Sequence, residues 1–144
     1  MKEADLYGIV SAMSTPVVRF RIDFTDSANV GPGKIALLEA IRGSGSLSQA
    51  ARELRMSYRR AWLLLASLNK AFKKPVARAT TGGRGGGGAE LTTFGEQLIS
   101  SYRALDREIS SLAARRLNLI VPVVARRDSR KMLAPRRSLV HNRA

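Results

Sequence analysis

Two adjacent arginines at the start of an apolar helical pattern are the side chains of this sequence best suited to bind another molecule. Arg59 and Arg60 follow Ser57 and Tyr58 directly. A guanidinium group carries a fixed charge and a planar fork of N–H donors, which fits a phosphate or the edge of a guanine base. Because neighbouring residues of a helix point about 100° apart, we expect one arginine to contact a base and the other the backbone.

Two serines are placed to begin the helices that would position these residues. Ser46 precedes an apolar run and has Gln49 three residues later, the spacing at which both side chains cap free N–H groups. Ser57 can cap a second helix that continues to Phe72. Two short helices joined by a turn at residues 54–56 predict a helix-turn-helix reader of DNA. The alternative is a small helical bundle with a solvated basic face.

The first of these helices also carries candidate contacts and a small-residue face. Ala50 and Ala51 would let the second helix cross closely. Ser48, Gln49 and Arg52 are better placed for phosphates than for bases.

The charge of the chain limits the kinds of partner it can have. The 144 residues carry a formal net charge of +14. Nine basic and two acidic side chains lie within residues 31–75, and the stretch from residue 126 onward is also basic. Such an excess attracts polyanions, so nucleic acid or an anionic membrane surface is the expected partner. No apolar run approaches the roughly 20 residues of a membrane span, and the first residues do not form a secretory signal. We expect a cytoplasmic protein without a membrane partner.

No arrangement of side chains typical of an enzyme occurs in the sequence. The absence of cysteine excludes disulfides, thiolate metal sites and a cysteine nucleophile. The single histidine, His141, lies in the basic tail. Asp106 and Glu108 would fall on different sides of a helix. We therefore expect no enzymatic activity, no metal site and no cofactor.

A strand and a helix are predicted before the two-helix unit. Every second side chain between residues 17 and 24 is apolar and most of the others are charged, which predicts a strand over Val17–Phe24 with one buried face. Its partner strand must come from later in the chain. Pro32 favours a helix start, and a helix is expected over Lys34–Arg42, ended by Gly43. Its expected buried residues are Ile35, Leu38 and Ile41, with Leu37 on the flank.

A β-hairpin with a glycine-rich tip is predicted after the second helix. Val76–Thr80 and Ala89–Leu91 have the pattern of short paired strands. Glycines such as Gly85 would let the backbone lie close against DNA, while Arg84 enters the minor groove. A plain hairpin without any such contact stays open as an alternative.

The same glycines also have the spacing of a dinucleotide-binding fingerprint, at Gly83, Gly85 and Gly88. Such a fingerprint must open directly into a helix within a βαβ unit. Here residues 89–92 intervene, so we do not expect nucleotide binding.

A long amphipathic helix capped by Thr92 is predicted after the hairpin. Its apolar residues recur at spacings of four and three, a heptad pattern typical of a pairing surface. Helix-turn-helix proteins bind two half-sites as two-fold dimers, so we expect homodimerisation there. The alternative is packing on its own domain. The seam consists of Leu98, Tyr102, Leu105, Ile109 and Leu112, with Phe94 one turn earlier.

The position of Trp62 allows two interpretations. It lies near the start of the second helix, beside the arginines and away from the apolar stripe. We interpret it as an anchor of the core or of the hinge rather than as a DNA contact.

The remaining patterns divide the chain into three parts. We expect residues 1–16 to form a loosely ordered leader. Residues 17–115 contain the predicted domain. Residues 116–144 predict a basic, disordered tail that either adds phosphate affinity or has no role, and an apolar stretch at 117–124 would make a short strand or fold back onto the dimer.

Three stretches together carry a family likeness: residues 44–51 (SGSLSQAA), residues 56–62 (MSYRRAW), and residues 81–92 (TGGRGGGGAELT) followed by Gly95. They resemble the N-terminal winged-helix DNA-binding domain of ModE-type molybdate-responsive transcription regulators, which is similar to that of LysR-type regulators. The likeness spans about residues 17–115, and the combination is far more specific than a single helix-turn-helix match.

The resemblance implies a dimer held through the N-terminal strand region and the helix after the hairpin, or wing. Carried over by position, it implies DNA contacts at Ser57, Tyr58, Arg59, Arg60 and Arg84. Full-length members bind molybdate through β-barrel domains that follow. Since about thirty residues follow the last predicted helix here, we do not expect this chain to sense molybdate.

The expected fold is mainly α with a small β component, a winged helix-turn-helix with an N-terminal strand, a glycine-rich wing and a long C-terminal dimerisation helix. The expected function is that of a sequence-specific transcription regulator, which binds double-stranded DNA as a homodimer on a near-palindromic operator. The alternative is a nucleoid-type or RNA-binding basic protein with little sequence specificity.

Overall fold

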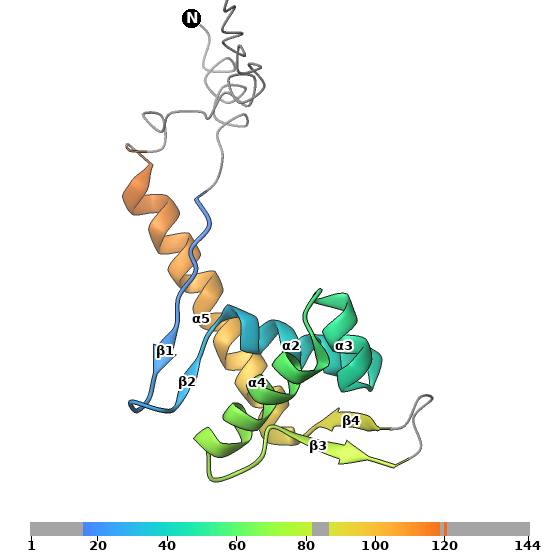
Figure 1. Cartoon of the computed structure of the whole chain (residues 1–144). Helices are drawn as coiled ribbons and strands as arrows, with labels where there is room; N and C mark the ends of the chain where they lie inside the picture. Colours follow the sequence, from blue (N-terminus) through green and yellow to red (C-terminus); the bar gives the residue numbers. More distant parts are fainter. Residues whose placement is uncertain (1–15, 82–86, 119, 121–144) are drawn as a thin grey trace, which may run out of the picture. The chain divides into compact units, whose positions relative to one another are not determined.

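A computed structural model describes residues 16–81, 87–118 and 120 of the chain (Figure 1). Residues 16–115 form one compact unit. The elements follow in the order β1 (Ile22–Asp23), β2 (Asn29–Val30), α2 (Pro32–Ser44), α3 (Leu47–Glu53), α4 (Tyr58–Ala71), β3 (Ala77–Thr80), β4 (Gly88–Leu91) and α5 (Thr93–Leu117). The prediction of a mainly α fold with a small β component is confirmed. No helix in the described ranges is long and apolar enough to cross a membrane.

Several sequence-based predictions concern residues outside this description. They are the leader, the basic tail with His141, and the tip of the second hairpin with Arg84 and Gly85. The apolar stretch at 117–124 is described only at residues 117, 118 and 120, where Leu117 ends α5.

β1 and β2 form a short antiparallel hairpin in which Ile22 pairs with Val30. The predicted strand Val17–Phe24 shows the expected alternation of exposed and half-buried side chains as far as Asp23. Two parts of that prediction are wrong: only Ile22 and Asp23 are paired, and Phe24 is 52% exposed. The ladder is short because the chain turns back at once, with the Phe24 N–H donating to the Ala28 carbonyl (2.8 Å).

The residues before β1 lie alongside α5 (Figure 1). The Phe20 ring stacks on the Tyr102 ring with a centroid separation of 4.6 Å. The Tyr102 hydroxyl donates to the Phe20 carbonyl (2.8 Å). Burial raises the pKa of the Tyr102 phenol, with a smaller contribution from Asp106, so the hydroxyl keeps the proton that it donates.

Helix α2 begins where the sequence predicts but ends later. Pro32 occupies its first turn, where a missing N–H costs nothing. Gly43 lies within the helix, so the prediction that it ends the helix is wrong. The helix ends at Gly45, which adopts the left-handed conformation (φ 68°) and donates its N–H to the Ile41 carbonyl (2.8 Å).

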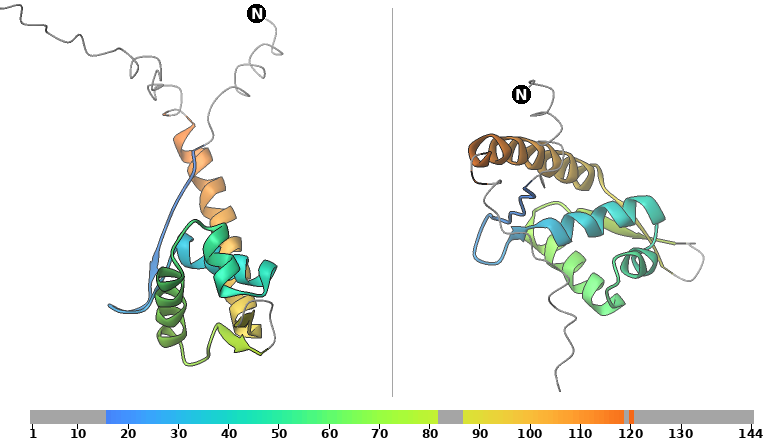
Figure 2. Two further views of the ribbon diagram at one scale, coloured as in Figure 1. Left: turned by 45° about the vertical axis from the view of Figure 1, so that its right-hand side comes forward. Right: turned by 90° about the horizontal axis from the view of Figure 1, so that it is seen from above.

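Helix α2 is the central element of the core. Ile35, Leu38 and Ile41 are fully buried as predicted, and Leu37, expected on the flank, is fully buried as well. Figure 2 shows α2 between α4 and α5 when the molecule is seen from above. One cluster around α2 joins side chains from β2, α4, α5 and the start of β3: Val30, Ile35, Leu38, Leu68, Val76, Ala77, Ile99 and Tyr102.

A buried lysine connects the first hairpin to α2 and α4. Lys34 is only 9% exposed. Its ammonium donates to the Asn29 carbonyl (2.8 Å), the Asn29 side-chain oxygen (3.0 Å) and the Ser67 hydroxyl (2.9 Å). All three of its N–H groups therefore have partners. Burial lowers the pKa of Lys34, and the positive charge of Arg21 lowers it further.

A second polar contact fixes the end of α4 to the second hairpin. The Asn69 side-chain oxygen accepts the Val76 N–H (2.8 Å), and its amide donates to the Ala77 carbonyl (3.1 Å). Strand β3 therefore starts at a defined distance from the last turn of α4. The Asn69 side chain thus takes the place of a backbone partner at the start of the hairpin.

The start of α5 packs directly on the chain before β3. Thr92 caps the helix as predicted, its hydroxyl accepting the Gly95 N–H (3.0 Å) and donating to the Pro75 carbonyl (2.6 Å). Gly95 is buried, and a β-carbon there would clash with the Val76 carbonyl oxygen. Only glycine lets the first turn of α5 approach this closely.

Two ion pairs connect α5 to α2. Arg103 makes a bidentate pair with Glu39, through Nε to Oε1 (2.7 Å) and Nη2 to Oε2 (2.6 Å). Arg103 also donates to Asp106 (3.3 Å). The more exposed Arg42 pairs with Glu96 (3.2 Å). The hydrogen bonds from Arg103 lower the pKa of the Glu39 carboxyl, and the same bonds raise the pKa of Arg103.

Candidate nucleic-acid interface

Helices α3 and α4 form the predicted helix-turn-helix, and each begins at the predicted serine. The Ser46 hydroxyl accepts the Gln49 N–H (3.2 Å), and the Ser57 hydroxyl accepts the Arg60 N–H (3.1 Å). The expected reciprocal cap from the Gln49 side chain is wrong. That side chain instead lies along the exposed face of α3, where Gln49 accepts from Arg52 (2.6 Å) and donates to Glu53 (3.5 Å).

The turn between the two helices contains an unusual backbone conformation. Arg55 has a φ angle of 54°, in the left-handed region that favours glycine. The Met56 N–H donates to the Ala51 carbonyl (3.0 Å), which closes the turn after α3. Sequence reasoning placed the turn correctly but could not identify Arg55, because no glycine or asparagine marks the position.

Small residues set the distance between α3 and its neighbours. Ala50, Ala51 and Ala61 are buried in a second cluster that also contains Leu37 and Ile41 of α2. Without larger side chains between them, α3 and α4 approach closely and hold one geometry. The prediction of a small-residue crossing face is confirmed, and this packing fixes the direction in which the start of α4 points.

The exposed first turn of α4 carries the predicted reading residues. Tyr58 is 57% exposed, and Arg59 and Arg60 are exposed as well. Among the described residues, no carboxylate pairs with either arginine. The free N–H groups of a helix start and its dipole also favour a negative charge. The arrangement presents two guanidinium groups and an aromatic hydroxyl at the surface.

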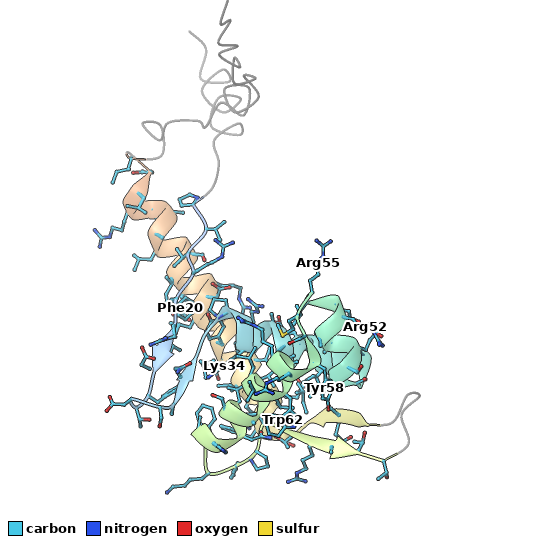
Figure 3. The ribbon with its side chains drawn as sticks, viewed as in Figure 1. Phe20, Lys34, Arg52, Arg55, Tyr58 and Trp62 are labelled. Carbon is cyan, nitrogen blue, oxygen red and sulfur yellow. The ribbon has the colours of Figure 1, made fainter. Side chains whose placement is uncertain are left out.

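The predicted phosphate contacts on α3 lie beside this turn. Gln49 and Arg52 are exposed and bonded to each other, and Ser48 is half-buried. Figure 3 shows Arg52 and Arg55 projecting outward from α3 and from the turn that follows it. Arg55 was not among the predicted contacts, although it is exposed in the turn between the two helices.

The second hairpin consists of the two predicted short strands, which pair antiparallel over Ala77–Thr80 and Gly88–Leu91. Arg78 pairs with Glu90 and Thr80 with Gly88. Strand β4 is also bonded to the start of the two-helix unit, where the Ala89 N–H donates to the Gly45 carbonyl (2.9 Å). The hairpin and the helix-turn-helix are thus held together by backbone contacts. Arg84 and Gly85 at its tip lie outside the described residues.

Trp62 is not the core anchor that its position suggested. Its side chain is 53% exposed. It lies one turn after Tyr58, on the side of α4 that faces the second hairpin (Figure 3). The interpretation as a core anchor is wrong because Ala61, rather than Trp62, fills the contact with α3. The other interpretation, an anchor of the hinge, stays a prediction.

The predicted heptad seam of α5 divides into two halves. Phe94, Leu98 and Tyr102 pack on the core of their own unit, and Tyr102 is only 4% exposed. Leu105 and Leu112 are exposed, and Ile109 is half-buried. They line a shallow groove that also includes Arg107, Glu108 and Arg115. The alternative of packing on its own domain therefore describes the first half, and dimerisation through any of these residues stays a prediction.

Sequence comparisons identify transcriptional regulators and molybdenum-pterin-binding proteins as relatives. No family model matches the chain. The molybdenum-pterin-binding protein MopB of Rhodobacter capsulatus is 44% identical over 85 residues, which is 59% of this chain and 32% of that protein. The transcriptional regulator ModE of Haemophilus influenzae is 35% identical over 95 residues, 66% of this chain and 37% of that protein.

A third relative carries a more explicit name. The DNA-binding transcriptional dual regulator ModE of Escherichia coli is 42% identical over 74 residues, 51% of this chain and 28% of that protein. The chain thus spans about a third of the length of the relatives it matches. The resemblance to ModE-type regulators is confirmed over the matched part.

Proposed function

We propose that this chain is a cytoplasmic, DNA-binding transcription regulator that recognises a near-palindromic operator as a homodimer. The observation that carries the proposal is the start of α4, where Tyr58, Arg59 and Arg60 are exposed on a capped helix fixed by α3. The relatives named as DNA-binding regulators support it. No catalytic step is part of the proposal.

In this proposal the first turn of α4 enters the major groove. A helix fits that groove, and an arginine there can donate two hydrogen bonds to the O6 and N7 atoms of guanine. Arg59 and Arg60 diverge around the helix, so one reads a base and the other binds a phosphate. Ser57 and Tyr58 lie at the tip of the same helix and contact the flanking backbone.

Phosphate contacts from α3 and the second hairpin set the orientation of α4 on the duplex. Ser48, Gln49 and Arg52 lie on the helix that would cross the backbone. Arg84 and Gly85 would reach the adjacent minor groove, and this role stays a prediction. Such contacts position the protein without reading sequence.

The exposed half of the α5 seam supports the homodimer. Leu105, Ile109 and Leu112 present apolar side chains on one face of a helix that extends away from its core contacts (Figure 2). A second copy would cover this face with the same residues, as a two-fold interface requires. Two copies would then present two α4 helices to two half-sites of the operator.

The alternative, a nucleoid-type or RNA-binding protein, depends on the net charge of +14 alone. Selection of bound sequences from random duplex DNA, followed by footprinting at moderate salt, separates the two. We expect an enriched motif with two-fold symmetry and a protected site. Uniform protection, with affinity that falls steeply with salt and no enriched motif, would support the alternative instead.

Variants of the two arginines test the reading residues directly. Arg59→Ala or Arg60→Ala is expected to weaken operator binding by roughly 1–3 kcal/mol for the residue that reads a base, and to relax specificity at one position. Arg42→Ala is the matched control, since Arg42 is exposed on α2 and pairs with Glu96, outside the surfaces proposed to contact DNA or a second copy. Unchanged operator affinity in both variants would refute the assignment.

The molybdenum-binding relatives make molybdate the small ligand to test. We expect no binding by this chain, and the expectation stays a prediction. Calorimetric titration of the purified protein with sodium molybdate, with sulfate as the control oxyanion, measures it. A heat of binding that saturates with molybdate, and is absent with sulfate, would show that this chain itself binds molybdate.

A further inference from the structure

A groove separates α4 from the second hairpin. It encloses about 880 Å³. Trp62, Ala66 and Lys70 lie along its α4 wall, and Arg78 and Ala79 along its β3 wall. Its floor is formed by buried residues of the core, namely Leu47, Ala77 and Ala89. The walls are held at a fixed separation by Asn69, which bonds α4 to the start of β3.

The α4 wall exposes large apolar side chains that the fold does not use. Trp62 is 53% exposed and Leu63 is 51% exposed, and both line the groove. On the opposite face of α4, Ala61 and Leu68 are fully buried. Adjacent large apolar groups left in water mark a surface that another molecule covers.

The charge around the groove indicates the chemistry of that molecule. Lys70 and Arg78 are its two charged lining residues within the described chain, and no carboxylate lines it. Lys73 and Lys74 follow just after α4 and are exposed. A groove with an apolar wall and only positive charge suits a partner with apolar and anionic groups in alternation, such as a sugar–phosphate strand.

The geometry of duplex DNA fits this assignment. A helix in the major groove and a hairpin in the adjacent minor groove are separated by one strand of the sugar–phosphate backbone. We propose that the groove between α4 and the β3–β4 hairpin seats this strand, with Trp62 packed against deoxyribose and with Lys70 and Arg78 binding its phosphates. The inference rests on the proposed function and assigns it three further contact residues.

These contacts carry affinity rather than sequence information. Deoxyribose and phosphate are the same at every base pair, so Trp62, Lys70 and Arg78 act equally on operator and on unrelated DNA. Each phosphate contact releases counterions, and the salt dependence of binding therefore counts the charges involved. Base-reading residues such as Arg59 and Arg60 would instead change the difference between operator and unrelated DNA.

Trp62 provides its own test because it is the single tryptophan of the chain. Quenching of its fluorescence by acrylamide, a neutral quencher, measures its accessibility to solvent. We expect the quenching constant to fall at least twofold when a saturating duplex is added, with binding followed separately by the anisotropy of labelled DNA. An unchanged quenching constant on bound DNA would overturn the inference while the proposed function stands. If no duplex binds at all, the proposed function fails, and the inference fails with it.

Variants of the three residues give a second test on the 144-residue chain. Lys70→Ala and Arg78→Ala are each expected to lower the slope of log K against log salt by about 1 per bound subunit, and therefore by about 2 for a dimer on the operator. Trp62→Ala is expected to weaken both complexes roughly tenfold without changing the slope. Trp62→Phe is expected to keep most of the wild-type affinity.

Arg42→Ala is the matched charge control, with an unchanged slope expected. Thermal unfolding of each variant confirms that it is folded before binding is measured. Overturning results are an unchanged slope in both charge variants, or a Trp62→Ala variant that loses affinity for one operator sequence only.

Discussion

Helices α4 and α5 both leave apolar side chains in water, but with different charges around them. On α4, Tyr58 and Trp62 border a groove whose charged lining residues, Lys70 and Arg78, are both positive. On α5, Leu105 and Leu112 border a shallow groove with charges of both signs, from Arg107, Glu108 and Arg115.

The difference indicates a different partner for each surface. A polyanion requires positive charge alone, whereas a second copy of the same chain requires charges that can complement themselves across a two-fold axis. Exposed apolar residues alone do not identify what covers them. The charges beside them make that distinction, and variants that separate the two surfaces can test it.

The largest expected effect comes from placing charge on the α5 surface. In the double variant Leu105→Glu, Leu112→Glu, dimerisation would bury four unpaired carboxylates per dimer, at a cost of several kcal/mol each. We expect a monomer in sedimentation equilibrium and a loss of operator affinity of at least ~100-fold. Unrelated DNA, which does not require two aligned half-sites, should be bound with a much smaller loss.

A control on the opposite face of α5 makes this result specific. Ser100 is exposed on that face, and Ser100→Glu adds the same kind of charge to the same helix. This variant should remain a dimer. If the double variant is still a dimer, α5 is not the dimer interface. The partner inferred for the α5 surface would then be wrong, and the partner inferred for α4 would be unaffected.

The second prediction compares the two faces of α4. Leu68 is fully buried, and Leu68→Ala is expected to lower the free energy of unfolding by about 2–5 kcal/mol. Trp62→Ala removes a larger side chain but should change it by less than about 0.5 kcal/mol, because the ring is half in water and supports no core contact. Urea unfolding of both variants gives the two values. If Trp62→Ala lowers the free energy of unfolding as much as Leu68→Ala does, Trp62 is an anchor of the core after all.

The third prediction concerns the half of α5 that is fixed to its own unit. Glu39→Gln removes the carboxylate that Arg103 holds in a bidentate pair, with an expected loss of roughly 1–2 kcal/mol of stability at neutral pH. Dimerisation and DNA affinity should hardly change. Glu96→Gln breaks the more exposed pair between the same two helices and serves as the control, with little effect expected.

The pH dependence of this variant follows from the direction of the pKa shift. Folding lowers the pKa of Glu39, so its stabilisation is complete above the unfolded value, near 4.3, and is lost as the pH falls through the folded value. The difference between wild type and Glu39→Gln in urea unfolding should therefore be full at pH 7 and vanish in acid. If the difference in the free energy of unfolding persists at low pH, the Glu39 side chain stabilises the fold through packing rather than through its charge.

Features fixed by neighbouring residues could be predicted from the sequence. Ser46, Ser57 and Thr92 all cap helices where their side chains meet N–H groups three residues away. The alanines of α3 predicted a close crossing, and the glycine-rich run predicted the hairpin. In each case the chemistry lies within a few residues along the chain.

Features that depend on distant packing could not be predicted in this way. A heptad pattern looks the same whether its residues meet a second copy or their own core, so the burial of Tyr102 against Phe20 was missed. Burial of Lys34 depends on Asn29 and Ser67, which only the fold brings together. Trp62 was misassigned because aromatic residues usually occupy cores, and the groove beside it exists only once the hairpin is in place.

The smallest expected effect separates stability from binding at a single residue of α4. Ser57→Ala removes the cap on the Arg60 N–H and should cost about 1 kcal/mol of stability. Ser57→Asp keeps a capping oxygen and complements the helix dipole, so its stability should match or exceed that of the wild type. The new carboxylate would nevertheless lie where the proposal puts a phosphate, and DNA affinity should fall in Ser57→Asp more than in Ser57→Ala. Because α5 is untouched, both variants should remain dimers. If Ser57→Asp binds DNA as tightly as the wild type, the start of α4 does not approach the backbone, and the positive surface of α4 must face a different partner.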